Sequence, residues 1–343
     1  MQPISTPGQT NPASARPALP QTPGETIERI HQRGFIRAGV SQGIRGLSLY
    51  EPAQRVWQGF DVELAKALAL AVTGDRDAVE FVPTAPSARF EAVSRGDLDI
   101  GTFNASATLG RELDNGLVFP QPMLHDGEAF LVRTAELQPH GAPSVATLER
   151  RVVAVQRGAT SRANLERWFR KEGLAFELVE HATPQQALQA YAQGECNLYA
   201  LDRIPLTGER LRLADPELHT VLDPGVSKEA MGPVVRAADP IWVRAVTWVM
   251  RCLIEAEERG ISRAMCSGGA PLPSAHLEFL QPPPGRCRQM GLVDHFVQGV
   301  IGGVGNYAEI FDRTLGLGST LNLTRGRNAL WCHGGLLISP SFD

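Results

Sequence analysis

The chain has 343 residues, of which 43% are hydrophobic, and it carries a formal net charge of −4 at pH 7. This length corresponds to about two domains, and the apolar content is sufficient for a buried core, which excludes a chain that is disordered throughout. The lack of a basic surplus argues against nucleic acid as a partner, and no apolar stretch is long enough to span a membrane.

Residues 1–25 differ in composition from the rest of the chain. Six prolines alternate with Ser, Thr, Gln and Ala, and Arg16 is the only charged residue before Glu25. Such a segment cannot bury enough apolar surface to fold, so we expect a disordered Pro-rich tail over 1–25. It lacks the basic residues and the uninterrupted apolar run of a signal peptide. Either the protein is not exported, or its export signal lies outside this chain.

After the tail, hydrophobic periodicity predicts two similar series of alternating strands and helices. The first series begins with a short helix over 26–33 and continues with strands over 35–41, 79–82 and 98–103, separated by helices over 60–72 and 86–95. The second series has strands over 152–156, 176–180 and 198–201, separated by helices over 161–171 and 184–193.

Each series is a βαβαβ run, so each is expected to form a parallel sheet covered by helices. Two such units in one chain predict two lobes of similar build. In open α/β sheets, ligands bind beyond the carboxyl ends of the strands. Two facing lobes would therefore place these strand ends around one shared cleft.

The rest of the chain predicts fewer regular elements. We expect a helix over 206–214, an apolar turn region near 226–235 and a long helix over 240–259, which has Pro240 in its first turn and stops at Gly260. The Pro- and Gly-rich segment 266–288 is expected to be a surface loop. One more helix over 296–314 would precede a Gly-rich tail.

No enzyme motif accompanies these elements. Residues 303–308 fit the dinucleotide pattern G-x-G-x-x-A, but no βαβ unit surrounds them and no acidic residue follows about 20 positions later. The five cysteines are widely spaced and form no CxxC pair. We therefore expect no cofactor, no metal site and no catalytic residue.

The most informative polar segment runs from Asn104 to Arg111, directly after a predicted strand end. Ser106 and Thr108 alternate with alanines, so their hydroxyls face one side, and Arg111 follows within one turn. Hydroxyls and a guanidinium suit a carboxylate, because Arg donates two parallel hydrogen bonds. The alternative interpretation is an N-capped helix start with a solvated Arg.

The second series offers complementary groups at its own strand ends. A glycine turn before Ala159 and Thr160 opens a helix, whose free backbone N–H groups favour an anion. Asp202 follows the last strand, where it is either a helix cap or a partner for an ammonium group. An Arg for a carboxylate and an Asp for an ammonium together indicate a site for an α-amino acid.

The chain resembles the solute-binding receptors of bacterial ABC amino-acid transporters, periplasmic binding protein family 3, in the general L-amino-acid-binding branch. The resemblance spans about 25–339. It rests on seven distinctive segments: GVSQG at 39–43, GFDVELAKALA at 59–69, RFEAVSRGDLDI at 89–100, SKEAMGPVVR at 227–236, LIEAEERGI at 253–261, GNYAEIFDR at 305–313 and RGRNALWCHGGL at 325–336. The last three of these segments lie outside the minimal fold of the family.

This resemblance implies an α/β, two-lobed, periplasmic-binding-protein-like (type II) fold with a hinge and a C-terminal extension. Lobe 1 would comprise 26–125 and 232–343, and lobe 2 would comprise 126–231. The resemblance also implies a monomer in the periplasm that binds an L-amino acid and delivers it to ABC permease membrane subunits. The absent signal peptide leaves a cytoplasmic location open.

The resemblance also assigns site residues. The α-carboxylate would be held by Arg111 with Thr108, Ser106 and Thr160, and the ammonium by Asp202. Ser41 would line the side-chain pocket. In this branch the position of Phe103 is usually Arg, so we expect Phe103 to favour apolar or smaller ligand side chains.

Two alternative functions stay open at this stage. The same fold could serve an orphan amino-acid sensor, which the absent signal peptide favours. It could also carry a dehydratase-type enzyme, although that would need a general acid in the cleft and no motif supplies one.

Overall fold

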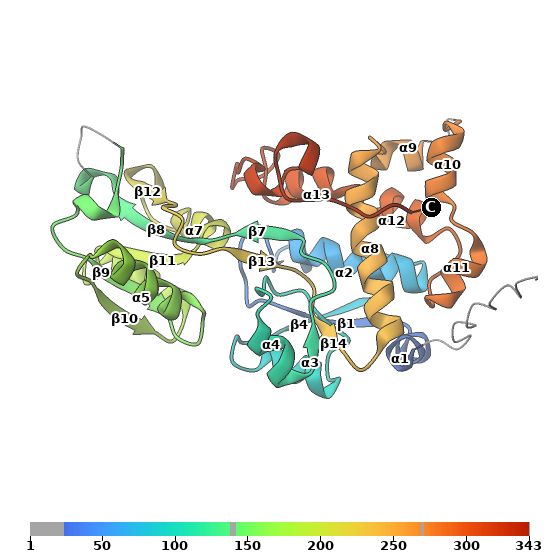
Figure 1. Cartoon of the computed structure of the whole chain (residues 1–343), viewed down its shortest axis with the longest axis horizontal. Helices are drawn as coiled ribbons and strands as arrows, with labels where there is room; N and C mark the ends of the chain where they lie inside the picture. The colour runs from blue at the N-terminus through green and yellow to red at the C-terminus, as the bar shows by residue number, and fades with distance from the viewer. Residues whose placement is uncertain (1–23, 138–141, 269–270, 343) are drawn as a thin grey trace, which may run out of the picture.

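The computed structural model describes residues 24–137, 142–268 and 271–342. The chain forms two bodies joined by the strands β7 (Leu124–Asp126) and β13 (Glu229–Met231), which run side by side between them (Figure 1). We call the described residues before β7 and after β13 the first lobe, and those between the two strands the second lobe. Residues 1–23 of the expected tail over 1–25 lie outside the described residues. The first helix begins at Glu25, within the range expected for the tail.

The first lobe is built around a three-stranded parallel sheet in the order β4-β1-β5. Its N-terminal strands and helices are α1 (Glu25–Arg33), β1 (Ile36–Val40), β2 (Leu49–Glu51), β3 (Val56–Gln58), α2 (Phe60–Thr73), β4 (Val79–Pro83), α3 (Arg89–Arg95), β5 (Ile100–Gly101), α4 (Leu109–Asn115) and β6 (Leu117–Val118). Its C-terminal elements are β14 (Val235–Arg236), α8 (Pro240–Glu258), α9 (Arg263–Ser267), α10 (Ser274–Leu280), α11 (Pro284–Gln289), α12 (Phe296–Val304), α13 (Tyr307–Thr314) and the 3₁₀ helices η4 (Gly326–Asn328) and η5 (Trp331–His333).

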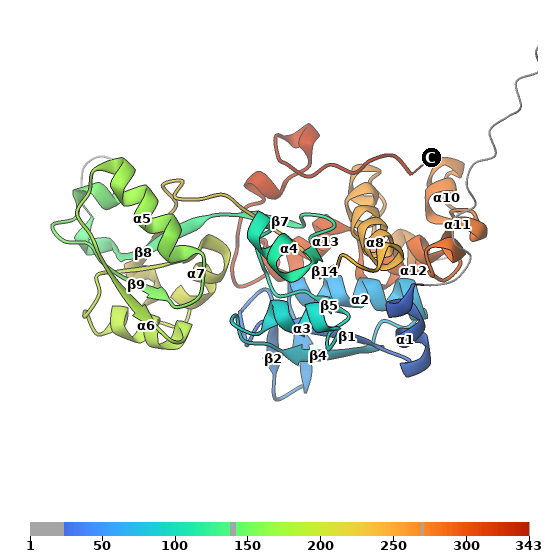
Figure 2. The same cartoon turned by 60° about the horizontal axis from the view of Figure 1, so that its bottom comes forward.

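The second lobe is built around a five-stranded sheet in the order β10-β9-β11-β8-β12. Its elements are β8 (Glu128–Arg133), β9 (Val152–Gln156), α5 (Ser161–Glu172), β10 (Glu177–His181), α6 (Pro184–Ala192), β11 (Leu198–Asp202), α7 (Arg203–Arg210), β12 (His219–Leu222) and the 3₁₀ helices η1 (Thr134–Glu136), η2 (Val145–Thr147) and η3 (Pro216–Leu218). Figure 2 shows α5 and α6 on opposite sides of this sheet. Two apolar clusters agree with this, since one contains α5 side chains and the other α6 side chains.

The strand order confirms the predicted repeat. In β4-β1-β5 and in β10-β9-β11, the first strand of the series lies between the second and the third, and all these neighbours are parallel. The second lobe adds β8 and β12, which run antiparallel to their neighbours and were not predicted. β8 is buried along almost its whole length, so its sequence lacks the alternation that marks a half-buried strand.

The C-terminal region corrects two sequence predictions. The segment 266–288 is not a surface loop, because α10 and α11 lie within it and bury Phe279, Leu280 and Cys287. Pro273, Pro283 and Pro284 stand at the starts of these helices, where a missing N–H group leaves no intrahelical hydrogen bond unmade. The helix expected over 296–314 is broken into α12 and α13 by Gly305, whose φ is +83°, and by a capping box that starts at Asn306.

The pattern G-x-G-x-x-A over 303–308 is explained by this break and by close helix packing. A Cβ atom at Gly303 would lie 2.3 Å from the Leu70 side chain of α2, and Gly305 needs its left-handed backbone conformation. Both glycines therefore serve the fold.

Other differences concern where elements begin and end. The first-lobe helix after β4 begins at Arg89 rather than at 86, and β5 is only two residues long. The helix expected over 206–214 covers Arg203–Arg210, immediately after β11. The region 226–235 contains β13 and β14 instead of a turn. These short strands pair with β7 and β6 more than 100 residues away, so local sequence carries little signal for them.

Most of the first-lobe core lies between α2, α8, α12 and α13. The longest of these, α8, buries one face that includes Trp242, Val246, Val249 and Leu253. Within the described residues, no helix combines the length and apolar character needed to cross a bilayer.

The residues after α8, which we call the C-terminal extension, form hydrogen bonds with one of the two connecting strands, β7, and with the residue before it. The side chain of Asn328 is fully buried and bonds to both backbone groups of His125 in β7. Its Oδ1 accepts from the His125 N–H at 2.7 Å, and its Nδ2 donates to the His125 carbonyl at 3.0 Å. Nearby, the hydroxyl of Tyr307 donates to the carbonyl of Met123 at 2.7 Å. The extension therefore anchors the strand on the side opposite β13.

We predict that Asn328→Ala lowers the free energy of unfolding by about 2 kcal/mol, because it leaves the N–H and C=O of His125 without their partners. Urea unfolding of both proteins measures this difference. Gln189→Ala on α6 is the control, since Gln189 is exposed and its side chain makes no hydrogen bond among the described residues. Equal stability of Asn328→Ala and wild type would contradict the anchoring role.

Candidate functional site

A cavity of about 390 Å³ lies between the two lobes. Its walls come from the carboxyl ends of all six strands of the repeated units: residues 41–43 after β1, 84–87 after β4, 104 and 106 after β5, 156–157 at the end of β9, 182–185 after β10, and 201–202 at the end of β11. This confirms the predicted cleft at the strand ends. Seven of the nine residues expected at the site line it: Ser41, Asn104, Ser106, Arg111, Ala159, Thr160 and Asp202.

Two of these residues, Ser41 and Asn104, are hydrogen-bonded to each other on the first-lobe side of the cavity. The Ser41 hydroxyl lies 2.7 Å from the Asn104 Oδ1 and 3.2 Å from the Phe103 carbonyl oxygen. Asn104 has a φ of +45°, in the left-handed region that Asn tolerates better than most residues. This turn ends β5 and directs the following segment along the cleft.

Arg111 projects from the first turn of α4, and within the described ranges no carboxylate forms an ion pair with it. Its Nη1 donates to the Ser106 carbonyl at 2.6 Å, and its guanidinium carbon lies 4.9 Å from the centre of the Phe90 ring. Burial lowers its pKa, while Glu229 and Asp202 oppose that shift. An arginine stays protonated under such conditions, so Arg111 offers a charged, oriented donor to the cavity.

Thr108 has a different role from the one expected. It is the N-cap of α4, where its hydroxyl accepts from the Arg111 N–H at 3.2 Å, and it does not line the cavity. This matches the alternative interpretation of a capped helix start. Its effect on the site is therefore to position Arg111, while Arg111 itself does face the cleft.

Phe103 is also not at the cavity wall, which corrects the expectation that it shapes the side-chain pocket. Its ring is fully buried and packs edge-on against Phe90 at a centroid distance of 5.8 Å. Phe103 follows β5 with its ring turned into the core between Gly39 and Gly101, where an added Cβ atom would clash. The absence of an arginine at position 103 therefore does not by itself remove positive charge from the cavity wall.

A cation comes instead from Arg89, which sequence reasoning missed. Arg89 lines the cavity, and its Nη1 donates to the Phe103 carbonyl at 3.1 Å. Burial and the neighbouring Arg111 lower the pKa of Arg89 to about 10, so it is still charged at neutral pH. The available signal was its place at the first turn of the helix that follows β4, close to a strand end.

On the second lobe, the start of α5 faces the cavity. Ala159, Thr160 and Ser161 line it, and the Thr160 side chain makes no capping bond. The first N–H groups of a helix have no partner within the helix, so they can donate to an anion. The N-terminus of α5 thus adds hydrogen-bond donors on the opposite wall from Arg111.

Asp202 ends β11 and supplies negative charge to the same cavity. Its Oδ1 is buried without a hydrogen-bond partner among the described residues. Burial raises the pKa of this carboxyl well above its usual range, and so do the nearby Glu128, Asp126 and Glu229, whereas Arg111 lowers it. A cation placed beside Asp202 would relieve both the desolvation and the repulsion.

Two further charged residues, Arg157 and Glu209, line the cavity and were not predicted. Arg157 follows β9 directly, so its place at a strand end was visible in the sequence. Glu209 lies on α7, and its carboxylate accepts two bonds from Arg212, at 3.0 and 3.1 Å. In the part of the chain that the structure describes, no group of His, Cys, Asp and Glu residues is arranged to hold a metal ion.

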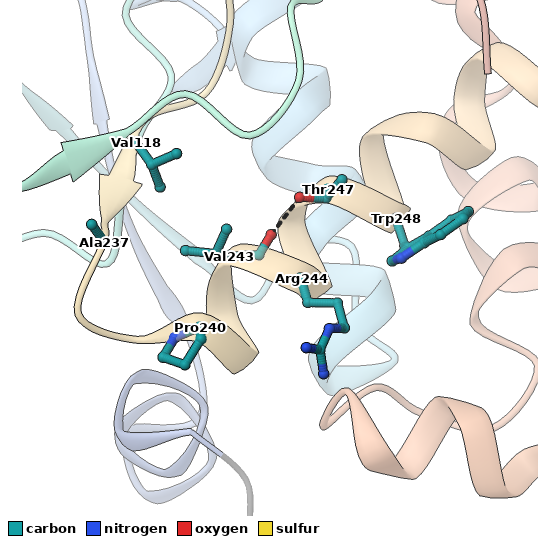
Figure 3. A pocket seen from close by; sticks show the side chains of 7 residues that line it. All are labelled: Val118, Ala237, Pro240, Val243, Arg244, Thr247 and Trp248. Atoms are coloured by element: carbon teal, nitrogen blue, oxygen red, sulfur yellow. Dashed lines mark hydrogen bonds between the residues drawn. The ribbon is translucent and has the colours of Figure 1, made fainter. Parts of the chain in front are cut away.

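A second hollow of about 380 Å³ lies on the first lobe beside the N-terminal half of α8 (Figure 3). One charged side chain, Arg244, lines it, and the Thr247 hydroxyl there is used within α8 as a donor to the Val243 carbonyl at 2.6 Å. It contains none of the residues expected to bind a ligand. The cavity between the lobes is therefore the better candidate site.

Comparisons with known proteins agree with the sequence resemblance. A family described as bacterial extracellular solute-binding proteins, family 3, matches residues 36–258. The general L-amino acid-binding periplasmic protein AapJ of Rhizobium johnstonii is 35% identical over 318 residues, which cover 92% of this chain and 92% of that protein. The glutamate/glutamine/aspartate/asparagine-binding protein BztA of Rhodobacter capsulatus is 32% identical over 319 residues, covering 92% of this chain and 93% of BztA.

A solved structure confirms the predicted fold class. The ABC transporter periplasmic binding protein from Brucella ovis with glutathione bound superimposes with a TM-score of 0.84 and 33% identity, over 91% of this chain and 97% of that chain. All three relatives are named as binding proteins, in agreement with the expectation that this chain is not an enzyme.

We predict that Phe103→Leu lowers the free energy of unfolding by about 1 kcal/mol, through loss of the aromatic pair with Phe90. Ligand affinity should fall by no more than about threefold, because Arg89 loses its contact with the Phe103 ring, 5.1 Å from the ring centre, but keeps its hydrogen bond to the Phe103 carbonyl. Urea unfolding and calorimetric titration measure the two effects, with Phe169→Leu in the second-lobe core as the control. A tenfold change in affinity at unchanged stability would instead place this ring at the ligand.

Proposed function

Because the chain belongs to the bacterial extracellular solute-binding proteins, family 3, we propose that it binds L-amino acids between its lobes and delivers them to the membrane subunits of an ABC permease. At the coarser level the chain is an amino-acid ABC transporter solute-binding protein, as its relatives' names indicate. We place it outside the cytoplasm by analogy with relatives that are named periplasmic.

One observation carries the proposal: the cavity has the guanidinium of Arg111 on the first lobe and the carboxyl of Asp202 on the second. Arg111 and the hydroxyl-rich first-lobe wall suit a carboxylate, together with the N-terminus of α5. Asp202 suits an ammonium group. An α-amino acid carries both groups on one carbon, so it can connect the two lobes where each group alone could not.

We further propose that the preferred ligands have a second carboxylate or a carboxamide. Arg89 places a second guanidinium in the cavity, and its charge is opposed by the neighbouring Arg111. A second anionic group on the ligand would offset this repulsion in a site with restricted access to water. The four amino acids in the name of BztA, and the glutathione bound to the Brucella ovis protein, have such groups.

We predict that Arg111→Ala weakens amino-acid binding by roughly 30- to 3,000-fold. Removing one partner of a buried charge pair costs about 2–5 kcal/mol, and each 1.4 kcal/mol is about tenfold in affinity. Arg111→Lys keeps the charge but loses the two-pronged donor geometry, so its affinity should lie between those of wild type and Arg111→Ala.

Calorimetric titration with L-glutamate and L-glutamine measures these affinities. Arg170→Ala is the matched control, because Arg170 is exposed on α5 and pairs only with Glu166 among the described residues. If Arg111→Ala binds within about threefold of wild type, Arg111 is not the carboxylate partner.

The role of Arg89 is tested with the neutral variant Arg89→Gln. We expect the affinity for L-glutamate to fall at least about tenfold more than the affinity for L-glutamine, because only glutamate loses a charged partner; an ion pair in a partly desolvated site is worth more than about 1.4 kcal/mol. Titrations with both amino acids measure the two losses. Equal losses would show that Arg89 supports the cavity without contacting the ligand side chain.

A further inference from the structure

Four carboxyl groups meet where the connecting strands enter the second lobe. Asp126 in β7 is paired directly with Glu229 in β13, and Glu128 in β8 is paired directly with Asp202 in β11. Asp126 and Glu128 are two residues apart on one extended chain, so their side chains lie on the same side. The register thus gathers Asp126, Glu128, Asp202 and Glu229 into one cluster, which we call the hinge carboxyl cluster.

Three members of the cluster, Asp126, Glu128 and Glu229, are buried, and Asp202 is partly buried. Glu128 is fully buried beside the side chains of Ser161 and Asn164, but neither of its carboxylate oxygens makes a hydrogen bond of normal geometry among the described residues. The same holds for one oxygen each of Asp126 and Asp202. By contrast, the Oε1 of Glu229 accepts from Asn164 and from Ser227, both at 2.9 Å.

The charged groups around the cluster do not balance four negative charges. Arg203 on α7 lies 3.6 Å from the Asp126 Oδ1. Arg111 and Arg89 face Asp202 from the first lobe, on the far side of the cavity. Asp223, near Asp126, adds a further negative charge, and Arg327 lies on the outer side of β7 near His125.

Charges this close and this far from water cannot all be ionised at neutral pH. Burial and the neighbouring carboxyls raise the pKa of Glu128 to about 8. Burial likewise raises the pKa of Asp126 to about 6. Because Glu128 and Asp202 lie opposite each other, their two carboxyl groups titrate together, and a bound proton is shared by the pair.

Building on the proposed function, we infer that the hinge carboxyl cluster holds a proton in the ligand-free protein and releases it to solvent when the ammonium group of an amino acid binds at Asp202. The carboxylic O–H bond breaks, its proton goes to water, and a carboxylate remains that faces the bound ammonium. Amino-acid binding is then coupled to the loss of about one proton.

The sign of the pH effect follows from this exchange. The ligand-free protein holds more protons than the complex, so affinity rises with pH up to the pKa of the protonated group. Between pH 6.5 and pH 8, the association constant should increase by roughly tenfold for one proton released. The ligand does not cause this trend, because the amino group of L-glutamate is protonated and its carboxylates are ionised throughout this range.

Calorimetric titration of the wild-type protein with L-glutamate and L-glutamine tests the coupling directly. The titration is done at pH 7 in two buffers of different ionisation enthalpy, and the difference in observed heat counts the protons released. We expect a count between about 0.5 and 1 for either ligand.

The variant Glu128→Gln keeps the shape of the side chain but cannot ionise. Its proton count should fall below about 0.3, and its affinity should become flat between pH 6.5 and pH 8. Glu172→Gln, at the exposed end of α5, is the matched control and should behave like wild type.

A ligand-free measurement tests the cluster separately. Ionising a buried carboxyl opposes folding, so wild-type stability should fall as the pH rises from 5 to 8. Glu128→Gln should therefore gain melting temperature relative to wild type over this range, and Glu172→Gln should not.

The possible outcomes are distinct. A proton count near zero with pH-independent affinity would overturn the coupling and leave the proposed function intact. Release that persists undiminished in Glu128→Gln would also overturn it, because the proton would come from outside the cluster. Absence of binding of either amino acid at every pH would overturn the proposed function, and the coupling with it.

Discussion

The pairing of β7 with β13 determines how the two lobes relate to each other. These strands are only three residues long, yet the chain passes through both on its way into and out of the second lobe. Antiparallel hydrogen bonds keep them together, so the lobes can change their angle more easily than their separation. The same register brings Asp126 opposite Glu229, close to the ligand cavity. The mechanical link between the lobes and the electrostatics of the site are thus built from the same few residues.

The cavity has the guanidinium of Arg111 and the carboxyl of Asp202 on opposite walls, without an ion pair between them among the described residues. Arg111 is held by the Ser106 carbonyl and the Phe90 ring, and one oxygen of Asp202 has no hydrogen-bond partner in the part of the chain that the structure describes. Neither group is neutralised by the other in this arrangement, since no ion pair joins them among the described residues. Desolvating unpaired charges is unfavourable. A zwitterion bound between the lobes, as proposed above, would supply both missing partners at once.

The sequence predicted the parts of this molecule that depend on local periodicity. The two βαβαβ series, their parallel sheets and the cleft at their strand ends all follow from patterns within about 70 residues. The connecting strands did not, because Met231 and Leu124 pair across more than 100 residues and each strand is too short for a pattern. Phe103 was expected at the site but lies in the core, because a strand of only two residues turns it there, and the cation that lines the cavity, Arg89, was not predicted. Side-chain direction after a short strand depends on what fills the space around it, here Gly39 and Gly101.

The double bond of Asn328 to His125 has one more consequence. In an antiparallel strand, alternate residues direct their N–H and C=O groups to opposite sides, so β13 satisfies Leu124 and Asp126 but leaves His125 facing away. Asn328 makes hydrogen bonds to both backbone groups on that side, as a neighbouring strand would. Without the Asn328 side chain, the N–H and C=O groups of His125 would form an open strand edge. Asn328 thus covers the edge of β7 that β13 leaves unpaired.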